Sequence, residues 1–151
     1  MNPGAALRSL LSTSPRRSVY LRVRRSELVP FLTLFDAPDA TRSIGDRGAT
    51  TVPTQALTML NSPFVRDMAG RLAQRALAKG ATPEAAIAQL FQIAFSRPPT
   101  AAERAKYEGY FLAQKAALGG ADPERAAAAA AQALAATCHV ALASNEFIYV
   151  D

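Results

Sequence analysis

Cysteine, histidine and tryptophan are rare or missing in this sequence. Cys138 is its only cysteine and His139 its only histidine, and it contains no tryptophan. A single cysteine excludes a disulfide within the chain and a cluster of metal-binding thiolates. Nucleophilic catalysis requires a base beside the nucleophile, and near His139 the sequence offers only Thr137, Cys138 and Ser144. We therefore do not expect this chain to be an enzyme on its own.

Long apolar runs are missing as well. No window approaches the roughly 18–20 consecutive apolar residues that a membrane-spanning helix needs. The N-terminus also lacks the apolar core of a secretory signal peptide. With 151 residues, 50% of them hydrophobic and 19% charged, the composition is that of a globular protein. The length suits a single domain with a core of its own.

Acidic residues are few in the first third of the chain. Residues 1–50 carry eight arginines against four acidic residues, which gives +4 of the total net charge of +5. A basic cluster of this kind can bind phosphate backbones, so a basic nucleic-acid-binding domain is one alternative. No helix-turn-helix pattern accompanies the cluster. A solvated face, or pairing with acidic residues elsewhere, is the interpretation we prefer.

The N-terminal third is expected to be extended or irregular. Residues 1–15 are poorly defined, and a single domain is expected over residues 16–151. Residues 18–24 alternate, with Val19, Leu21 and Val23 on one side, as in a half-buried strand. Residues 35–53 are rich in proline, glycine and aspartate and predict a polar loop. Within it, Asp36 and Asp39 flank a proline, which is typical of turns.

Helices are expected over the rest of the chain, residues 54–151. Ser62-Pro63, Thr82-Pro83 and Asp122-Pro123 each place a capping residue before proline, and Thr100 to Glu103 forms a capping box. These signals predict helices at 55–61, 63–79, 83–95, 101–118 and 123–143. The fold class is therefore mainly α, an irregular bundle of four or five helices with a short N-terminal β-strand or extended segment. The apolar stripes expected to be buried include Val65, Leu72, Ala76, Leu77, Ile87, Leu90, Phe91, Tyr107, Tyr110, Phe111, Leu118, Ala131, Leu134, Cys138 and Leu142.

Cofactor chemistry finds little support. Covalent haem attachment needs C-x-x-C-H, but alanine stands in place of the first cysteine before Cys138-His139. We interpret Cys138 as a core residue and His139 as a satisfied or exposed side chain. Asp36, Asp39 and Asp46 share one loop, but their spacing matches no calcium-binding loop. We expect no cofactor and no metal.

Several spaced motifs resemble one family. Arg16-Arg-Ser-Val-Tyr-Leu, Phe35-Asp-Ala-Pro-Asp and Thr50-Thr-Val-Pro-Thr-Gln-Ala-Leu-Thr-Met-Leu-Asn-Ser-Pro-Phe-Val are similar to the C-terminal part of the DUF1553 domain. Phe95-Ser-Arg-Pro-Pro-Thr-Ala-Ala-Glu and Asn145-Glu-Phe-Ile-Tyr-Val-Asp resemble the closing motifs of that domain. The resemblance covers about residues 8–151.

This resemblance supplies a context rather than a mechanism. DUF1553 domains are typical of large exported proteins of Planctomycetes, where they commonly follow a DUF1549 domain and often a cytochrome-c-like domain. The resemblance therefore implies an exported or periplasmic location and, as partners, other domains of a DUF1549/DUF1553-type protein or a separate chain. It implies no established activity.

The function expected from these observations is that of a non-catalytic helical packing and interaction module within a larger protein. The alternative from a different class is an accessory part of an exported hydrolase that acts on polymeric substrates. The residues to test as a ligand or partner site lie in the polar loop and the short helix after it: Asp36, Asp39, Arg42, Asp46, Arg47, Gln55 and Asn61.

Overall fold

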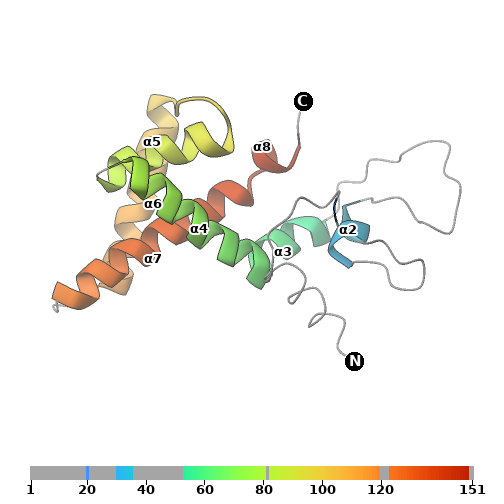
Figure 1. Ribbon diagram of the computed structural model, residues 1–151, viewed down its shortest axis with the longest axis horizontal. Helices are drawn as coiled ribbons and strands as arrows, with labels where there is room; N and C mark the ends of the chain where they lie inside the picture. Colours follow the sequence, from blue (N-terminus) through green and yellow to red (C-terminus); the bar gives the residue numbers. More distant parts are fainter. Residues whose placement is uncertain (1–19, 21–29, 36–52, 81, 120–122, 150–151) are drawn as a thin grey trace, which may run out of the picture. The chain divides into compact units, whose positions relative to one another are not determined.

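The described part of the chain is mainly helical. In this computed structural model (Figure 1), the described residues are 20, 30–35, 53–80, 82–119 and 123–149. The side chains of Pro30 and of residues 123–127 are not described. The chain divides into two compact units, Met1–Thr58 and Met59–Asp151. The helices are α2 (Pro30–Leu34), α3 (Pro53–Asn61), α4 (Pro63–Lys79), α5 (Pro83–Ala94), α6 (Ala101–Leu118), α7 (Pro123–Leu142) and α8 (Asn145–Ile148).

The expected fold class, mainly α, is confirmed. The strand expected over residues 18–24 lies outside the described residues except for Tyr20, which has a 3₁₀ conformation, so the strand finds no support. No residue in the described ranges belongs to a strand. The polar loop over 35–53 lies outside these ranges apart from its two end residues, as does all of the segment 1–15.

The helices α4, α5 and α6 begin where the sequence predicted, whereas α3 begins at Pro53, two residues before its predicted start. The Thr82 hydroxyl accepts a hydrogen bond from the amide of Ala85 at 3.3 Å. At α6 both halves of the capping box form, because the Thr100 hydroxyl accepts from the Glu103 amide and the Glu103 carboxylate accepts from the Thr100 amide. Ser62 precedes α4 without a side-chain cap bond. There Pro63 alone sets the helical φ angle at the first position.

The core of the second unit is built around α7. This helix packs against α4 and α6, and α4 also packs against α5 (Figure 1). Ile87, Leu90 and Phe91 of α5 are completely or almost completely buried. The remaining buried apolar residues are Met59, Val65, Ala69, Ala73, Ala76, Ala86, Phe111, Ala129, Ala133, Leu134, Cys138, Ala141 and Leu142.

Alanines rather than large side chains make up most of the buried face of α4. Ala69 and Ala73 are buried, whereas Leu77, expected inside, is 44% exposed. We expected the bulkier residues of α4 to face inward, and this was wrong in part. Small side chains let two helix backbones approach closely, so the buried stripe follows the alanines. The inward orientation expected for Tyr110, Leu118 and Ala131 was also wrong, since all three are exposed.

Gly80 ends α4 at a point where two backbones meet. Its amide donates to the Ala76 carbonyl at 2.9 Å, and its φ of −116° is open to any residue. A Cβ atom at this position would lie 2.7 Å from the backbone of Ala85 and of Ala86 in α5. Glycine is therefore required by the close approach of α5 and not by the backbone angle.

Candidate functional site

The site predicted from the sequence falls largely outside the described residues. Asp36, Asp39, Arg42, Asp46 and Arg47 all lie there. Two members of the set, Gln55 and Asn61, are on α3 and are described. The structure therefore does not bring the seven residues together as a described cluster.

Gln55 has a structural role within the first unit. It is 3% exposed, and its Nε2 donates to the carbonyl of Leu34 at 2.9 Å. Leu34 is the last residue of α2, where carbonyls have no partner within the helix. Gln55 thus satisfies one end of α2 from α3. Asn61, at the C-terminal end of α3, is exposed.

A polar cluster in the second unit, centred on Arg97, was missed by sequence reasoning. Helix α5 ends at Ala94, and Ser96 has a φ of 58°. This left-handed residue turns the chain out of the helix, a position usually given to glycine. Arg97 follows at once and precedes two prolines that cannot continue a helix. The turn therefore places the arginine side chain in the connection between α5 and α6.

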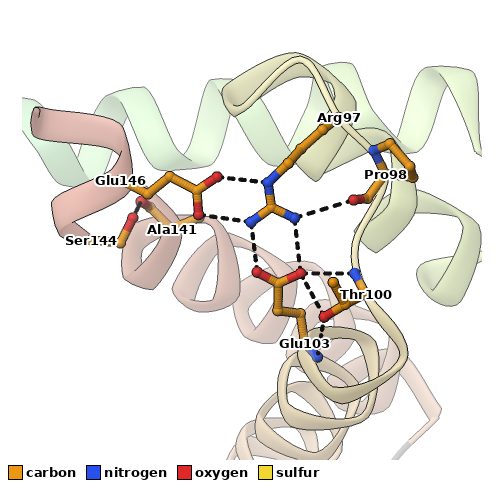
Figure 2. A network of polar contacts seen from close by, with 7 residues as sticks. All are labelled: Arg97, Pro98, Thr100, Glu103, Ala141, Ser144 and Glu146. Carbon is orange, nitrogen blue, oxygen red and sulfur yellow. Dashed lines mark hydrogen bonds and ion pairs between the residues drawn. The ribbon is translucent and has the colours of Figure 1, made fainter. Parts of the chain in front are cut away.

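The guanidinium of Arg97 uses all five of its N–H donors (Figure 2). Nε and Nη2 donate to the two oxygens of Glu146, at 2.7 and 2.8 Å. Nη2 and Nη1 donate to the two oxygens of Glu103, at 2.6 and 2.9 Å. Nη1 also donates to the Pro98 carbonyl at 3.2 Å. Two bidentate pairs of this kind combine charge with fixed geometry.

Aromatic rings support the same guanidinium. Its central carbon lies 5.5 Å from the centre of the Phe91 ring and 5.8 Å from that of Phe95. Phe91 in turn meets Tyr107 edge to face at 4.9 Å. A cation over an aromatic face gains electrostatic attraction. Arg97 is thus held both by the rings of Phe91 and Phe95 and by the carboxylates of Glu103 and Glu146.

The charges of the Arg97 cluster reinforce one another. The hydrogen bond from Arg97, with further bonds from Thr100, lowers the pKa of Glu103 from 4.5 to about 2. The bonds from Glu103 and Glu146 raise the pKa of Arg97 above its ordinary value. Burial, together with the charges of Glu103 and Glu146, raises the pKa of the Tyr107 hydroxyl. At neutral pH the cluster therefore holds the Arg97 cation against the ionised carboxylate of Glu103, next to the protonated phenol of Tyr107.

Acid should weaken this cluster in a defined range of pH. Because the folded-state pKa of Glu103 is depressed, its contribution to stability is complete above about pH 4.5 and is lost as pH falls toward about 2. We expect the melting temperature to fall across this range, and to fall less steeply in Glu103→Gln. Far-UV circular dichroism melts between pH 2 and 6 measure this.

Glu108→Gln, on the same helix and outside the cluster, is the matched control. It should show the acid dependence of the unmodified protein. Parallel pH curves for Glu103→Gln and the unmodified protein would contradict the assignment.

One part of the Arg97 cluster was visible in the sequence, and the other was not. The capping box identifies Glu103, and both of its partners lie in the motif Phe95-Ser-Arg-Pro-Pro-Thr-Ala-Ala-Glu. Glu146 belongs to the second closing motif, 49 positions from Arg97. The two motifs that carry the family resemblance in the C-terminal half thus meet at one side chain.

Cys138 and His139 have the roles expected of them. Cys138 is completely buried, and burial raises the pKa of its thiol to about 12, so the thiol stays protonated at neutral pH. Nε2 of His139 lies 2.9 Å from the Met59 carbonyl, to which it donates. That carbonyl is in the last turn of α3 and has no helical partner. His139 therefore ties α7 to the end of α3.

The described residues hold neither a metal-binding group nor a membrane span. No three histidine, cysteine, aspartate or glutamate side chains in these ranges gather as a group that could hold a metal ion. Within the same ranges, no helix has both the length and the apolar character to cross a membrane.

Comparison with known proteins gave one match. A family model described as a protein of unknown function (DUF1553) matches residues 6–111. The matched region contains Arg97 and Glu103 and ends within α6, whereas Glu146 lies beyond it. No curated protein and no solved structure matches the chain.

Proposed function

Because this chain belongs to the DUF1553 family, we propose that it is a non-catalytic helical packing and interaction module, the C-terminal part of a larger protein. The observation that carries the proposal is the saturation of Arg97. All five donors of this partly exposed arginine are used by Glu103, Glu146 and the Pro98 carbonyl. Every donor of Arg97 is directed at the protein itself, so the side chain joins the connection between α5 and α6 to Glu103 of α6 and to Glu146 of α8.

The two carboxylates of the cluster are also poorly suited to acid catalysis. A general acid must hold a proton near neutral pH, which requires a raised pKa. Glu103 has a pKa of about 2, because Arg97 and Thr100 stabilise its ionised form. Both oxygens of Glu146 accept hydrogen bonds from Arg97. These features favour the packing role over the alternative of an accessory hydrolase part.

Partners of the module are proposed to be the other domains of a DUF1549/DUF1553-type protein, or a separate chain. Exposed leucines on several helices support an interaction role. Leu57 and Leu112 are 57% exposed and Leu60 is 51% exposed. Aliphatic side chains at this exposure are common singly, but contact with a partner would remove them from water.

Replacing Arg97 by methionine tests the packing role. Methionine keeps an unbranched, flexible side chain at this position but removes the guanidinium, which leaves Glu103 and Glu146 without their shared cation. We expect a helical protein whose melting temperature is lower by about 5 °C or more, since two carboxylates lose a charged partner. Far-UV circular dichroism of the whole chain gives both the helicity and the melting temperature.

Arg104→Met is the matched control, because Arg104 is exposed on α6 near the same site. We expect it to change the melting temperature by no more than about 1–2 °C. Equal melting temperatures for Arg97→Met and the unmodified protein would remove the structural role of Arg97. The proposal of a packing module would then lose its main support.

A further inference from the structure

Helix α8 meets the rest of its unit through Glu146 and through side chains that remain partly exposed. None of its residues is buried, and Phe147 and Tyr149, at its end, are 40% and 38% exposed. Its backbone bonds are local, as from the Phe147 amide to the Ser144 carbonyl at 3.1 Å. Segments with little buried surface open at a lower free energy than a core. Helix α8 is therefore the described helix of the second unit that can separate with the least loss of packing.

Arg97 does not depend on Glu146 for its orientation. Glu103 holds Nη1 and Nη2 from the opposite side, and the Pro98 carbonyl accepts a second bond from Nη1. The rings of Phe91 and Phe95 also contact the guanidinium, with their centres 5.5 and 5.8 Å from its central carbon. When α8 moves away, these contacts remain. The edge formed by Nε and the second N–H of Nη2 then faces solvent in the geometry that Glu146 had used.

That edge is suited to one ligand chemistry. A guanidinium edge with two parallel N–H groups matches the two oxygens of a carboxylate. Glu146 shows the fit directly, with Nε and Nη2 at 2.7 and 2.8 Å from its oxygens (Figure 2). Its side chain is 47% exposed, so a competing carboxylate can reach the pair from solvent.

We propose that α8 is a displaceable strap, in which Glu146 occupies a carboxylate-binding edge of Arg97 that an acidic side chain of a partner protein can take over. The inference rests on the proposed packing function and adds the chemistry of the partner. In the closed state the chain supplies its own ligand. In the open state Phe147 leaves with α8, and the partner's carboxylate completes the five bonds of Arg97.

A titration of ¹⁵N-labelled protein with sodium acetate, at constant ionic strength set by sodium chloride, tests the edge. In Glu146→Ala we expect the Nε–H resonance of Arg97 to move along a saturable curve. In the unmodified protein the same shift should need at least about tenfold more acetate, because a tethered carboxylate competes at high effective concentration. The Nε–H of Arg71, paired with Asp67 at 3.1 Å, is the internal control and should not saturate.

The source of the carboxylate is tested with a second probe, the α-amide of N-acetylglutamate. Its only carboxylate is that of the side chain. Tighter binding of this probe than of acetate supports a protein side chain as the natural ligand. Tighter binding of acetate overturns a protein partner in favour of a small free carboxylate. If Glu146→Ala does not fold, Glu146→Gln removes the charge with little change of shape and takes its place.

Hydrogen exchange tests the strap. The amides of Phe147 and Tyr149, which bond to the carbonyls of Ser144 and Asn145, should exchange about tenfold faster in Glu146→Ala, with those of α6 and α7 unchanged. Unchanged exchange at these two amides overturns the strap, and an unsaturable acetate response in Glu146→Ala overturns the edge. Neither result affects the melting test of Arg97→Met, so the proposed packing function is tested independently of the strap and of the edge.

Discussion

Replacing Phe91 by alanine is expected to destabilise the chain by about 3–5 kcal/mol, because it truncates the largest fully buried side chain of the described residues. Phe91 is 1% exposed. The centre of its ring lies 5.2 Å from that of Phe95 and 4.9 Å from that of Tyr107. Alanine would leave a cavity and remove the ring beneath Arg97. For a domain whose total stability is about 5–15 kcal/mol, this is a large share. Urea unfolding followed by circular dichroism measures it.

Two further variants separate the causes of that loss. Phe91→Leu keeps most of the apolar volume and should cost less, about 1–2 kcal/mol, because only the ring contacts are lost. Leu112→Ala removes an apolar side chain that is 57% exposed and should change stability by less than about 0.5 kcal/mol. If Phe91→Ala and Leu112→Ala had similar effects, Phe91 would not be part of a packed core.

The second large effect is expected at Gly80. In Gly80→Ala the new methyl group would meet the backbone of Ala85 and Ala86 at 2.7 Å, and backbone atoms cannot rotate away as a flexible side chain can. The ends of α4 and α5 must then separate. We expect a loss of about 1–3 kcal/mol, the usual cost of forcing extra volume into a packed region. The midpoint of urea unfolding gives the change.

Gly70, on the same helix, provides the matched control. A Cβ atom at Gly70 would meet nothing within 4 Å. Alanine is the better helix former, so Gly70→Ala should stabilise the chain by about 0.5–1 kcal/mol. The change from glycine to alanine is therefore expected to stabilise the chain at Gly70, within α4, and to destabilise it at Gly80, the C-cap of α4. Loss of stability in both variants, to the same degree, would show that close approach at Gly80 is not the cause.

The helices of the second unit were predictable because their boundary signals are local. Thr82, and Thr100 with Glu103, bond to backbone groups within three residues, so the sequence alone contains both partners. Proline at the first position of α4 and of α5 fixes its own φ angle at a helical value, which needs no distant partner. The end of α5 was less accurate. We expected the helix to reach Phe95, but it ends at Ala94 because Ser96 already adopts the left-handed conformation.

Features that depend on distant segments were predicted less well. The burial of Ala69 and Ala73 follows from how closely α4 meets its neighbours, which the residue sizes in α4 do not reveal. The pairing of Arg97 with Glu146 joins segments 49 positions apart, and isolated charges leave no periodic signal. The polar loop suggested a site through composition alone. Among the residues proposed for that site, Gln55 of α3 is a buried structural side chain. The role of the five loop residues as a binding site remains a prediction.

The Arg97 cluster also implies an order of events during folding. The contact from Arg97 to Glu103 spans 6 positions and can form as soon as the turn before α6 does. The contact to Glu146 spans 49 positions and requires α6 and α7 to be in place first, because closing a longer loop costs more chain entropy. We therefore expect Glu146 to form its bonds late. An interaction absent from the transition state acts on the rate of unfolding rather than on the rate of folding. We thus expect the pairing of α8 with Arg97 to be among the last contacts that the second unit forms and to slow its unfolding.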